Sequence, residues 1–429
     1  MLDQTFTYKN LRRLVTKDEI IRFRPYSYNS PLSRKDQIDI SIEKLSSMVH
    51  RGVYRPKKLR KKHVKGRDVY SASSFYDHII LKKINQDIRR LYRIRVSNRN
   101  LIIPQIFRLL SESSPMLVVR MDVKSFYESI PIANVMSSLE KSFLLDDFSL
   151  RIIGCIIEDN NLGGCSGVPR GLSISSSLSE RYMRGVDKQI STIRGIYYYA
   201  RYVDDIILFT WDIYSNIIQA SEEVMQRHGL HLNEKTEVLE VNCRDRDKKC
   251  NPGGFVKKCG CKFDPLYQKS ISFLGYKFTL SDSPAKKPGS KVEVRISDEK
   301  IRKFKEKIVL AFLSFLSSGD YSLLLKRLKF LSSNHVVKSR DSGTNLSSGI
   351  FYSYPHCNEF DWASSLDWFV GSVLAGTKSR LSKRLRSTLS AAQIKALRSC
   401  SFYEGAKHRR MRSFTKSDLM DIQECWKNV

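Results

Sequence analysis

The chain has 429 residues, and its 74 Lys and Arg residues outnumber its 44 Asp and Glu residues, which gives a formal net charge of +30 at pH 7. That length favours two or three lobes over one domain, and that charge favours a polyanionic partner, nucleic acid ahead of an anionic membrane. The longest apolar stretch, residues 308–316, is too short for a transmembrane helix, and residues 2–17 lack the apolar centre of a signal peptide. Nine cysteines, an odd number scattered along the chain, are typical of a reducing compartment, so we expect a cytoplasmic protein.

The N-terminal part of the chain predicts helices on either side of a basic segment. Apolar residues repeat at helical spacing over residues 36–48 and again over residues 75–92. Residues 51–67 carry nine Lys or Arg residues and no acid, and a short strand is expected over residues 67–71. Apolar residues interrupt the basic run, which favours a folded basic face over a solvated tail.

A single carboxylate, Asp122, ends the next predicted strand. Residues 116–121 are mostly apolar, and a helix is expected to begin near Pro131. Taken alone, Asp122 is most simply a turn residue at the end of a strand. Its interest comes from the acids that follow it in the chain.

Residues 166–180 combine glycines with a run of serines. Gly167, Pro169 and Gly171 punctuate a turn, and the helix after it begins with residues of poor helix propensity. Such a segment suits a place where a nucleotide or template backbone approaches closely and meets the N–H groups of a helix start. A flexible loop is the alternative.

Two adjacent acids, Asp204 and Asp205, stand between two apolar runs. Residues 196–199 and 206–209 each predict a strand, so the acids are expected at the tip of a β-hairpin. Like charges repel there and add nothing to a core, so they make best sense around a multivalent cation shared with a third acid. Asp122 supplies that acid if its strand neighbours the hairpin. Two Mg²⁺ ions in such a site, roughly 3.5–4 Å apart, are suited to phosphoryl transfer.

The remaining chain predicts a strand, a hairpin and a long helical region. A helix ends near Gly229 and a strand follows Lys235, while Gly275 marks the bend of a hairpin over residues 272–278. From about Arg295 the pattern is mostly helical and basic.

Four cysteines cluster ahead of that hairpin: Cys243, Cys250, Cys259 and Cys261. Their spacing is irregular and contains no C-x-x-C pair, so it matches known zinc sites poorly. A basic insertion is therefore favoured over a zinc-stabilised loop.

The order of these motifs resembles the palm of reverse transcriptases, from about Lys57 to Phe278. The motifs are Asp122-x-x-x-Phe126-Tyr127, Gly167-x-Pro169-x-Gly171, Tyr202-x-Asp204-Asp205, Lys235 and Phe273-Leu274-Gly275. The chain is most similar to the bacterial defence-associated enzymes of the abortive-infection and unknown groups, and more distantly to retron and group II intron enzymes.

The resemblance implies an α+β right-hand polymerase fold, with fingers, a palm built on an antiparallel sheet, and a helical thumb. Residues 1–115 would form an N-terminal extension and fingers, and residues 116–290 the palm. Within the palm range, part of the fingers would lie at about 135–165 and a basic cysteine-containing insertion at 243–262. Residues 291–429 would form a basic helical thumb or C-terminal extension.

The resemblance also implies roles for individual residues. Asp122, Asp204 and Asp205 would be catalytic and, with Val123, would hold two Mg²⁺ ions, for which Mn²⁺ is an alternative. Lys235 would protonate the leaving pyrophosphate, and Tyr127 would exclude a ribose 2′-hydroxyl. The other nucleotide-binding residues would be Lys65, Arg67, Val123, Phe126, Pro169, Arg170 and Gly171. The primer grip would be Phe273, Leu274 and Gly275. Arg170 departs from the family, where many relatives have Gln, and could hold a phosphate or alter substrate choice.

We therefore predict an RNA-directed DNA polymerase of bacterial antiphage defence that copies a non-coding RNA. Its partners would be the RNA template, dNTPs, the DNA product or RNA–DNA hybrid, and a companion reverse transcriptase or a second copy of the chain, with no membrane. Template-independent or protein-primed DNA synthesis and RNA-directed RNA synthesis are alternatives at the same site. A maturase-like RNA-binding protein is the alternative outside the enzymes.

Overall fold

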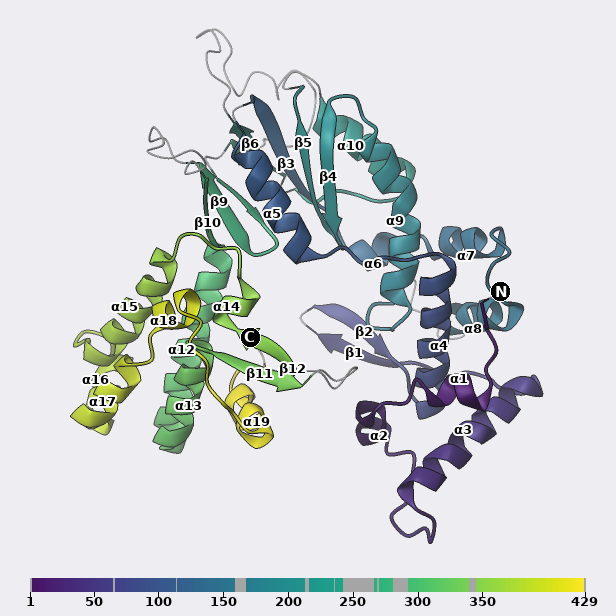
Figure 1. The fold of residues 1–429 in the computed structure, drawn as a ribbon, viewed down its shortest axis with the longest axis horizontal. Helices are drawn as coiled ribbons and strands as arrows, with labels where there is room; N and C mark the ends of the chain where they lie inside the picture. The colour runs from purple at the N-terminus through teal and green to yellow at the C-terminus, as the bar shows by residue number, and fades with distance from the viewer. Residues whose placement is uncertain are drawn as a thin grey trace. The chain divides into compact units, whose positions relative to one another are not determined.

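The structure is a computed structural model that describes residues 2–64, 66–112, 114–158, 167–212, 216–234, 236–241, 266–267, 270–280, 292–338 and 345–427. The chain divides into two compact units (Figure 1). The first comprises the described residues within Met1–Asn98, Pro115–Val238 and Cys243–Leu266. The second comprises those within Arg99–Ser114, Leu239–Asn242 and Tyr267–Val429.

The first unit begins with helices and a basic hairpin. Its helices are α1 (Tyr8–Arg12), α2 (Lys17–Phe23), α3 (Arg34–His50), α4 (Phe75–Leu91), α6 (Phe126–Ser129), α7 (Ile132–Glu140), α8 (Asp147–Glu158), α9 (Ser175–Ser191) and α10 (Ile217–Arg227). Strands β1 (Arg60–Val64) and β2 (Arg67–Ser71) pair antiparallel. Every residue of β1 is exposed, so the basic segment presents its charges to solvent on a folded hairpin, as predicted.

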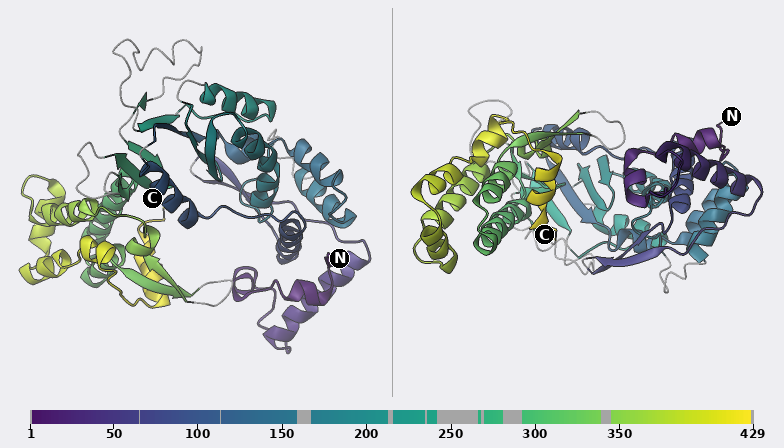
Figure 2. Two further views of the ribbon diagram at one scale, coloured as in Figure 1. Left: turned by 45° about the horizontal axis from the view of Figure 1, so that its top comes forward. Right: turned by 90° about the horizontal axis from the view of Figure 1, so that it is seen from below.

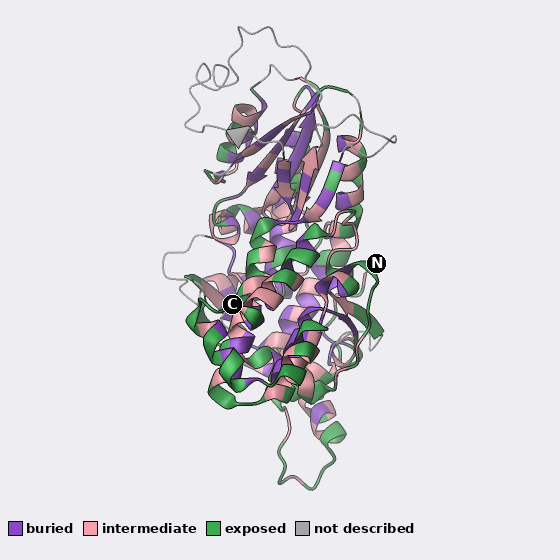
Figure 3. Cartoon of the chain, turned by 90° about the vertical axis from the view of Figure 1, so that its left-hand side faces the viewer, coloured by how far each residue is buried: buried purple, intermediate pink, exposed green. Residues whose placement is uncertain are grey.

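A five-stranded sheet carries the predicted acids. Its order is β4-β5-β3-β6-β7, formed by β3 (Met116–Asp122), β4 (Ile196–Tyr202), β5 (Asp205–Thr210), β6 (Glu237–Val241) and β7 (Leu266–Tyr267). Strand β5 lies antiparallel between β3 and β4, and its residues after Asp205 are all buried. Figure 3 shows the strands of this sheet largely in the colour of buried residues. The predicted hairpin and its neighbouring Asp122 strand are therefore confirmed.

Helix α4 shows how the first unit holds its core. The hydroxyl of Ser74 accepts the Asp77 N–H at 3.1 Å and so caps the start of the helix. Ile79, Ile80 and Ile84 are fully buried, together with Ile88 one turn later, which confirms the predicted apolar face. Helix α9 packs against β4 and against α10, so these helices cover the sheet (Figure 1).

The second unit is mostly helical and has two small sheets of its own. Its helices are α5 (Arg99–Leu110), α12 (Asp298–Ser318), α13 (Tyr321–Leu331), α14 (Ile350–Ser353), α15 (Asp361–Ala375), α16 (Arg380–Thr388), α17 (Ala391–Arg398), α18 (Phe402–Lys407) and α19 (Lys416–Glu424). One sheet is β10-β9-β8, from β8 (Ser270–Phe273), β9 (Tyr276–Leu280) and β10 (Val292–Ile296), and the other pairs β11 (Asn334–Lys338) with β12 (Asn345–Gly349). The predicted hairpin with Gly275 at its bend is confirmed.

Burial of one face of α12 organises the second unit. Ile308, Phe312 and Phe315 of this helix are buried in a core that α13, α15 and α18 share. Figure 2 shows α12 and α13 side by side within this unit. Gly319 ends α12 in the left-handed conformation, and the Asp320 side chain accepts the Leu323 N–H at 2.9 Å to start α13. Within the described residues, no helix is both long and apolar enough to cross a bilayer.

Candidate active site

The structure brings the three predicted acids together at one end of the first unit's sheet. Asp122 lies directly opposite Asp205 in the β3–β5 register. Asp204 occupies the two-residue turn between β4 and β5, next to Val203, whose φ is 60°. The Val123 N–H donates to the Asp204 carbonyl at 3.1 Å, which ties the end of β3 to that turn. A β-branched residue at positive φ is strained, so other contacts must stabilise this turn.

Two of the acids have dedicated side-chain partners. Asn233 donates its side-chain amide to Asp122 Oδ2 at 2.8 Å and its N–H to the Asp122 carbonyl at 2.7 Å. Arg120 donates to Asp205 Oδ1 at 2.9 and 3.3 Å and to Glu237 Oε1 at 2.9 Å. These contacts hold the carboxylates of Asp122 and Asp205 in place at the end of the sheet.

Asp204 is in a different electrostatic environment. Burial raises the pKa of Asp204, and the charges of Asp122 and Asp205 raise it further, while Arg170 acts in the opposite direction. Burial opposes the charge of Arg120, but Asp205 and Glu237 hold the pKa of Arg120 above its usual value. The ionised form of Asp204 therefore lacks a cationic partner like Arg120, which stabilises the charge of Asp205.

A hard divalent cation is the kind of ligand that these carboxylates suit. Among the described residues, no three His, Cys, Asp or Glu side chains form a group that could hold a metal ion unaided. Mg²⁺ ordinarily takes only one or two carboxylates and completes its shell with water and substrate phosphates, so that absence is compatible with it. Asp122 and Asp204 are the carboxylates that would hold it, and the mutual repulsion that raises the pKa of Asp204 is what a cation would relieve.

A buried arginine supports the turn that carries Asp204. The Arg201 side chain is 4% exposed and binds two acids of α9, Glu180 at 2.8 and 3.1 Å and Asp187 at 2.8 and 2.9 Å. Its remaining donor reaches the Val203 carbonyl at 2.9 Å. Because Val203 has the strained φ, Arg201 connects α9 directly to the conformation of the turn.

The predicted nucleotide-binding residues form a second cluster beside the acids. Arg170 pairs in bidentate fashion with Glu128, at 3.0 and 3.2 Å, and its guanidinium lies 5.0 Å from the centre of the Tyr127 ring. Phe126 packs edge-on against Tyr127 at 5.2 Å and is itself buried. Burial opposes the charge of Glu128, but its hydrogen bonds with Arg170 lower its pKa below the usual value, and the exposed Arg67 acts in the same direction. In this structure the Arg170 side chain thus contacts protein groups on two sides.

The glycines and serines around Pro169 have a structural reason that differs from the predicted one. A Cβ on Gly167 would lie 2.2 Å from the Glu128 carbonyl, and Gly171, at φ 100°, would place one 2.6 Å from the Tyr70 carbonyl. The close approach is therefore made by the chain's own backbone. Ser175 is buried and donates to the Pro169 carbonyl, and Ser177 donates to Asn85 Oδ1 at 2.6 Å. The serines thus hydrogen-bond inside the unit.

Several predicted residues lie elsewhere. Lys65, Lys235 and the four cysteines Cys243, Cys250, Cys259 and Cys261 lie outside the described residues. Phe273, Leu274 and Gly275 belong to the second unit, where Leu274 and Gly275 form the turn between β8 and β9 with φ of 48° and 79°. Phe273 is fully buried there, and the Gly275 carbonyl accepts the Ser297 N–H at 2.9 Å.

The sequence reasoning missed the residues that hold the acids in place. Arg120 could have been found, because residues two apart in a strand share a face and Asp122 is two residues further on. Arg201, Glu180 and Asn233 gave no such signal, since their partners come from distant parts of the chain.

A model of the family described as reverse transcriptase (RNA-dependent DNA polymerase) matches residues 59–278, just over half of the chain. No curated protein sequence matches. Among solved structures, a Candida tropicalis telomerase truncated of its C-terminal domain is 14% identical, over 60% of this chain and 60% of its own, with a TM-score of 0.36. Candida tropicalis telomerase with a TWJ fragment of telomeric RNA is 12% identical over 93% and 68%, with a TM-score of 0.39. The corresponding Candida albicans complex is 13% identical over 81% and 56%, with a TM-score of 0.33.

The present chain thus spans 60% of the length of the first of these telomerase chains. The family match covers the three acids, the Tyr127–Arg170 cluster and the turn of β8 and β9. The mixed helices and antiparallel sheets of the first unit agree with the predicted α+β fold. The chain belongs to the reverse transcriptase family, the RNA-dependent DNA polymerases, which are nucleotidyltransferases.

Proposed function

We propose that this reverse transcriptase copies a non-coding RNA into DNA as part of bacterial antiphage defence, in the cytoplasm. The observation that carries the polymerase assignment is the convergence of Asp122, Asp204 and Asp205 at one end of the sheet. The defence role and the dedicated RNA are supported by the resemblance of the Ser125–Pro131 and Gly167–Ser175 segments to defence-associated enzymes. The formal charge of +30 supports a polyanionic template.

In the proposed reaction, the 3′-hydroxyl of a primer attacks the α-phosphate of a dNTP in line, and pyrophosphate leaves. A divalent cation bound at Asp122 and Asp204 would lower the pKa of the hydroxyl and stabilise the leaving oxygens. Asn233 and Arg120 keep Asp122 and Asp205 in place, so these two carboxylates are positioned before substrate arrives. Arg170 holds the Tyr127 ring where the resemblance puts the sugar of the incoming nucleotide.

The test replaces both acids of the turn, as Asp204→Ala with Asp205→Ala, and measures dNTP incorporation on an RNA template with a DNA primer. We expect incorporation to be lost while RNA binding and the folded far-UV circular dichroism spectrum are retained. Glu43→Ala, an exposed acid on α3, is the control for loss of negative charge. Incorporation that survives in the double variant would reject the assignment.

Three further arms separate the alternatives. Incorporation without added RNA would indicate template-independent or protein-primed synthesis, and incorporation of NTPs in place of dNTPs would indicate an RNA polymerase. A double variant that still protects bacteria from phage would indicate a maturase-like RNA-binding role. Sequencing of nucleic acid that co-purifies with the active protein would identify the template.

A further inference from the structure

A polar hollow lies between α7 and α9 in the first unit, and none of its residues belongs to the active site. Its lining comprises Asn134, Ser137, Ser138, Lys141, Ser142 and Arg181, around a cavity of about 460 Å³. Four of the six recur at i, i+3, i+4 and i+7, so they share one face of α7 and its C-terminal end. Helix α7 buries its apolar face through Val135 and Leu139, and these polar residues form its other face.

The lining offers hydrogen-bond donors and no carboxylate. The Ser142 hydroxyl is already used, because it donates to the Leu139 carbonyl and meets the Tyr92 hydroxyl, both at 2.6 Å. The Arg181 guanidinium lies 4.8 Å from the centre of the Tyr92 ring, and its Nε is buried with no acceptor among the described residues. Buried polar groups are rarely left unsatisfied, so this arginine points to an absent anion.

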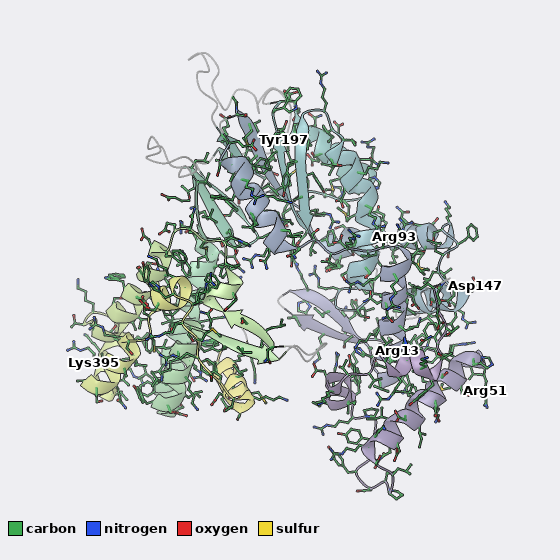
Figure 4. All side chains as sticks on the ribbon, in the orientation of Figure 1. Arg13, Arg51, Arg93, Asp147, Tyr197 and Lys395 are labelled. Atoms are coloured by element: carbon green, nitrogen blue, oxygen red, sulfur yellow. The ribbon has the colours of Figure 1, made fainter. Side chains whose placement is uncertain are left out.

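Lys141 adds a second charge to the same hollow. It is exposed, and within the described ranges no carboxylate pairs with it. One turn after Arg181, Arg184 donates to the carbonyl of Arg93 at 2.6 Å. Figure 4 labels Arg93 beside α9. Among the residues that the structure describes, the hollow thus combines two cations that form no ion pair with two serine hydroxyls, those of Ser137 and Ser138, that form no hydrogen bond. Cations and hydroxyls together are typical of a phosphate site.

An exposed aromatic residue follows the lining residue Ser142 in the chain. Phe143 directly follows Ser142, is 92% exposed, and has a φ of 52°. A bulky residue in the left-handed region is strained, and an exposed phenyl ring gains nothing from the core. Exposed aromatic rings beside cations are the elements with which proteins stack the bases of single strands.

We propose that this hollow binds one nucleotide of a single-stranded RNA, with its phosphate on Arg181 and Lys141 and its base against Phe143. A strand fits better than a free nucleotide, because the hollow is open to solvent and pockets for small ligands enclose most of their ligand. The proposal rests on the proposed function only in taking RNA as the ligand. The chain would thereby hold RNA at a point separate from its catalytic acids.

Photo-cross-linking tests this directly. An oligouridylate carrying 4-thiouridine is bound to the full chain, irradiated and digested with trypsin, which cuts after Lys141 and Arg151. We expect cross-linked RNA on the peptide Ser142–Arg151, which contains Phe143, and loss of that cross-link in Phe143→Ala. Phe143→Ala removes an exposed ring and so keeps the fold. The cross-link should persist in Asp204→Asn, which separates failure here from failure of the polymerase assignment.

Binding measured against salt provides the second readout. Lys141→Gln with Arg181→Gln should reduce the slope of log affinity against log salt by about 1.4, since each cation lost on a single strand contributes about 0.7. Phe143→Ala should weaken binding about tenfold. Lys188→Gln, an exposed cation of α9 outside the hollow, is the control and should leave both the slope and the cross-link unchanged. No cross-link on Ser142–Arg151, or unchanged binding in the double and Phe143 variants, would overturn the proposal. Displacement of the cross-link by free uridine monophosphate would assign the hollow to a nucleotide instead of a strand.

Discussion

Replacing Arg201 should separate the stability of the first unit from the position of its catalytic turn. Arg201 makes five hydrogen bonds, four to Glu180 and Asp187 and one to the Val203 carbonyl, and its side chain is 4% exposed. Breaking a buried ion pair by removing one partner costs about 3–5 kcal/mol, because the remaining charge is left uncompensated. We therefore expect Arg201→Met to lower the free energy of unfolding by about that amount, measured by urea denaturation.

Neutralising Glu180 and Asp187, the acids left unpaired by Arg201→Met, should restore stability without restoring activity. In Arg201→Met with Glu180→Gln and Asp187→Asn, no unpaired buried charge remains, and most of the lost free energy of unfolding should return. The Val203 carbonyl still has no guanidinium donor, so the strained turn remains unsupported. We expect dNTP incorporation to stay low in this triple variant, with the loss in kcat and little change in KM.

Arg201→Lys provides the conservative comparison. Lysine keeps the charge but cannot form the planar fork that binds two carboxylates and a carbonyl at once. It should therefore retain more stability than Arg201→Met and still lose turnover. If the triple variant recovers both stability and turnover, then Arg201 has only a structural role and does not position Asp204.

The remaining predictions concern the acids, the tyrosine and the glycines. Asp204→Asn should raise the melting temperature of the metal-free protein near neutral pH, because the raised pKa of Asp204 means that its ionised form destabilises the fold; the gain should shrink as the pH falls through that raised pKa, and a constant gain would contradict this reasoning. Arg170→Gln should release the Tyr127 ring and lower the preference for dNTPs over NTPs in single-nucleotide incorporation by about 2- to 30-fold, the range of a cation–π contact, whereas an unchanged ratio would show that Arg170 does not position the ring. Gly167→Ala should lower the melting temperature, since its Cβ would meet the α6 backbone at 2.2 Å, while Gly154→Ala, in α8 with nothing within 4 Å, should not.

The strands that carry the acids could be predicted from sequence because each is a short apolar run with a carboxylate at one end: Asp122 ends β3, and Asp205 begins β5. Asp122, Asp204 and Asp205 were expected on neighbouring strands, and the register places Asp122 opposite Asp205. Burial on both faces of β5 makes its sequence almost continuously apolar, which is a strong local signal.

Other elements gave no local signal. Strand β11 has only two apolar residues, Val336 and Val337, and β12 is mostly polar and exposed, so periodicity could not separate this hairpin from the helical region around it. The close approach of Gly167 to the Glu128 backbone is also invisible in sequence, because it depends on how α6 and the Pro169 turn pack. A glycine in the sequence can indicate a close approach, but it does not indicate which segment makes that approach.

The Asp204-Asp205 pair looks symmetrical in the sequence, and the structure makes the two acids unequal. Asp205 has a guanidinium partner in Arg120, and Asp122 has an amide partner in Asn233. The cation that acts on Asp204 is Arg170, which is already paired with Glu128, and burial together with the two neighbouring acids raises the pKa of Asp204. Of the three acids, Asp204 is therefore the one whose charge depends most on a ligand. A divalent cation that lowers that pKa would bind and ionise Asp204 in one step, so metal affinity should rise with pH more steeply in the native chain than in Asp122→Asn, where one source of repulsion is gone.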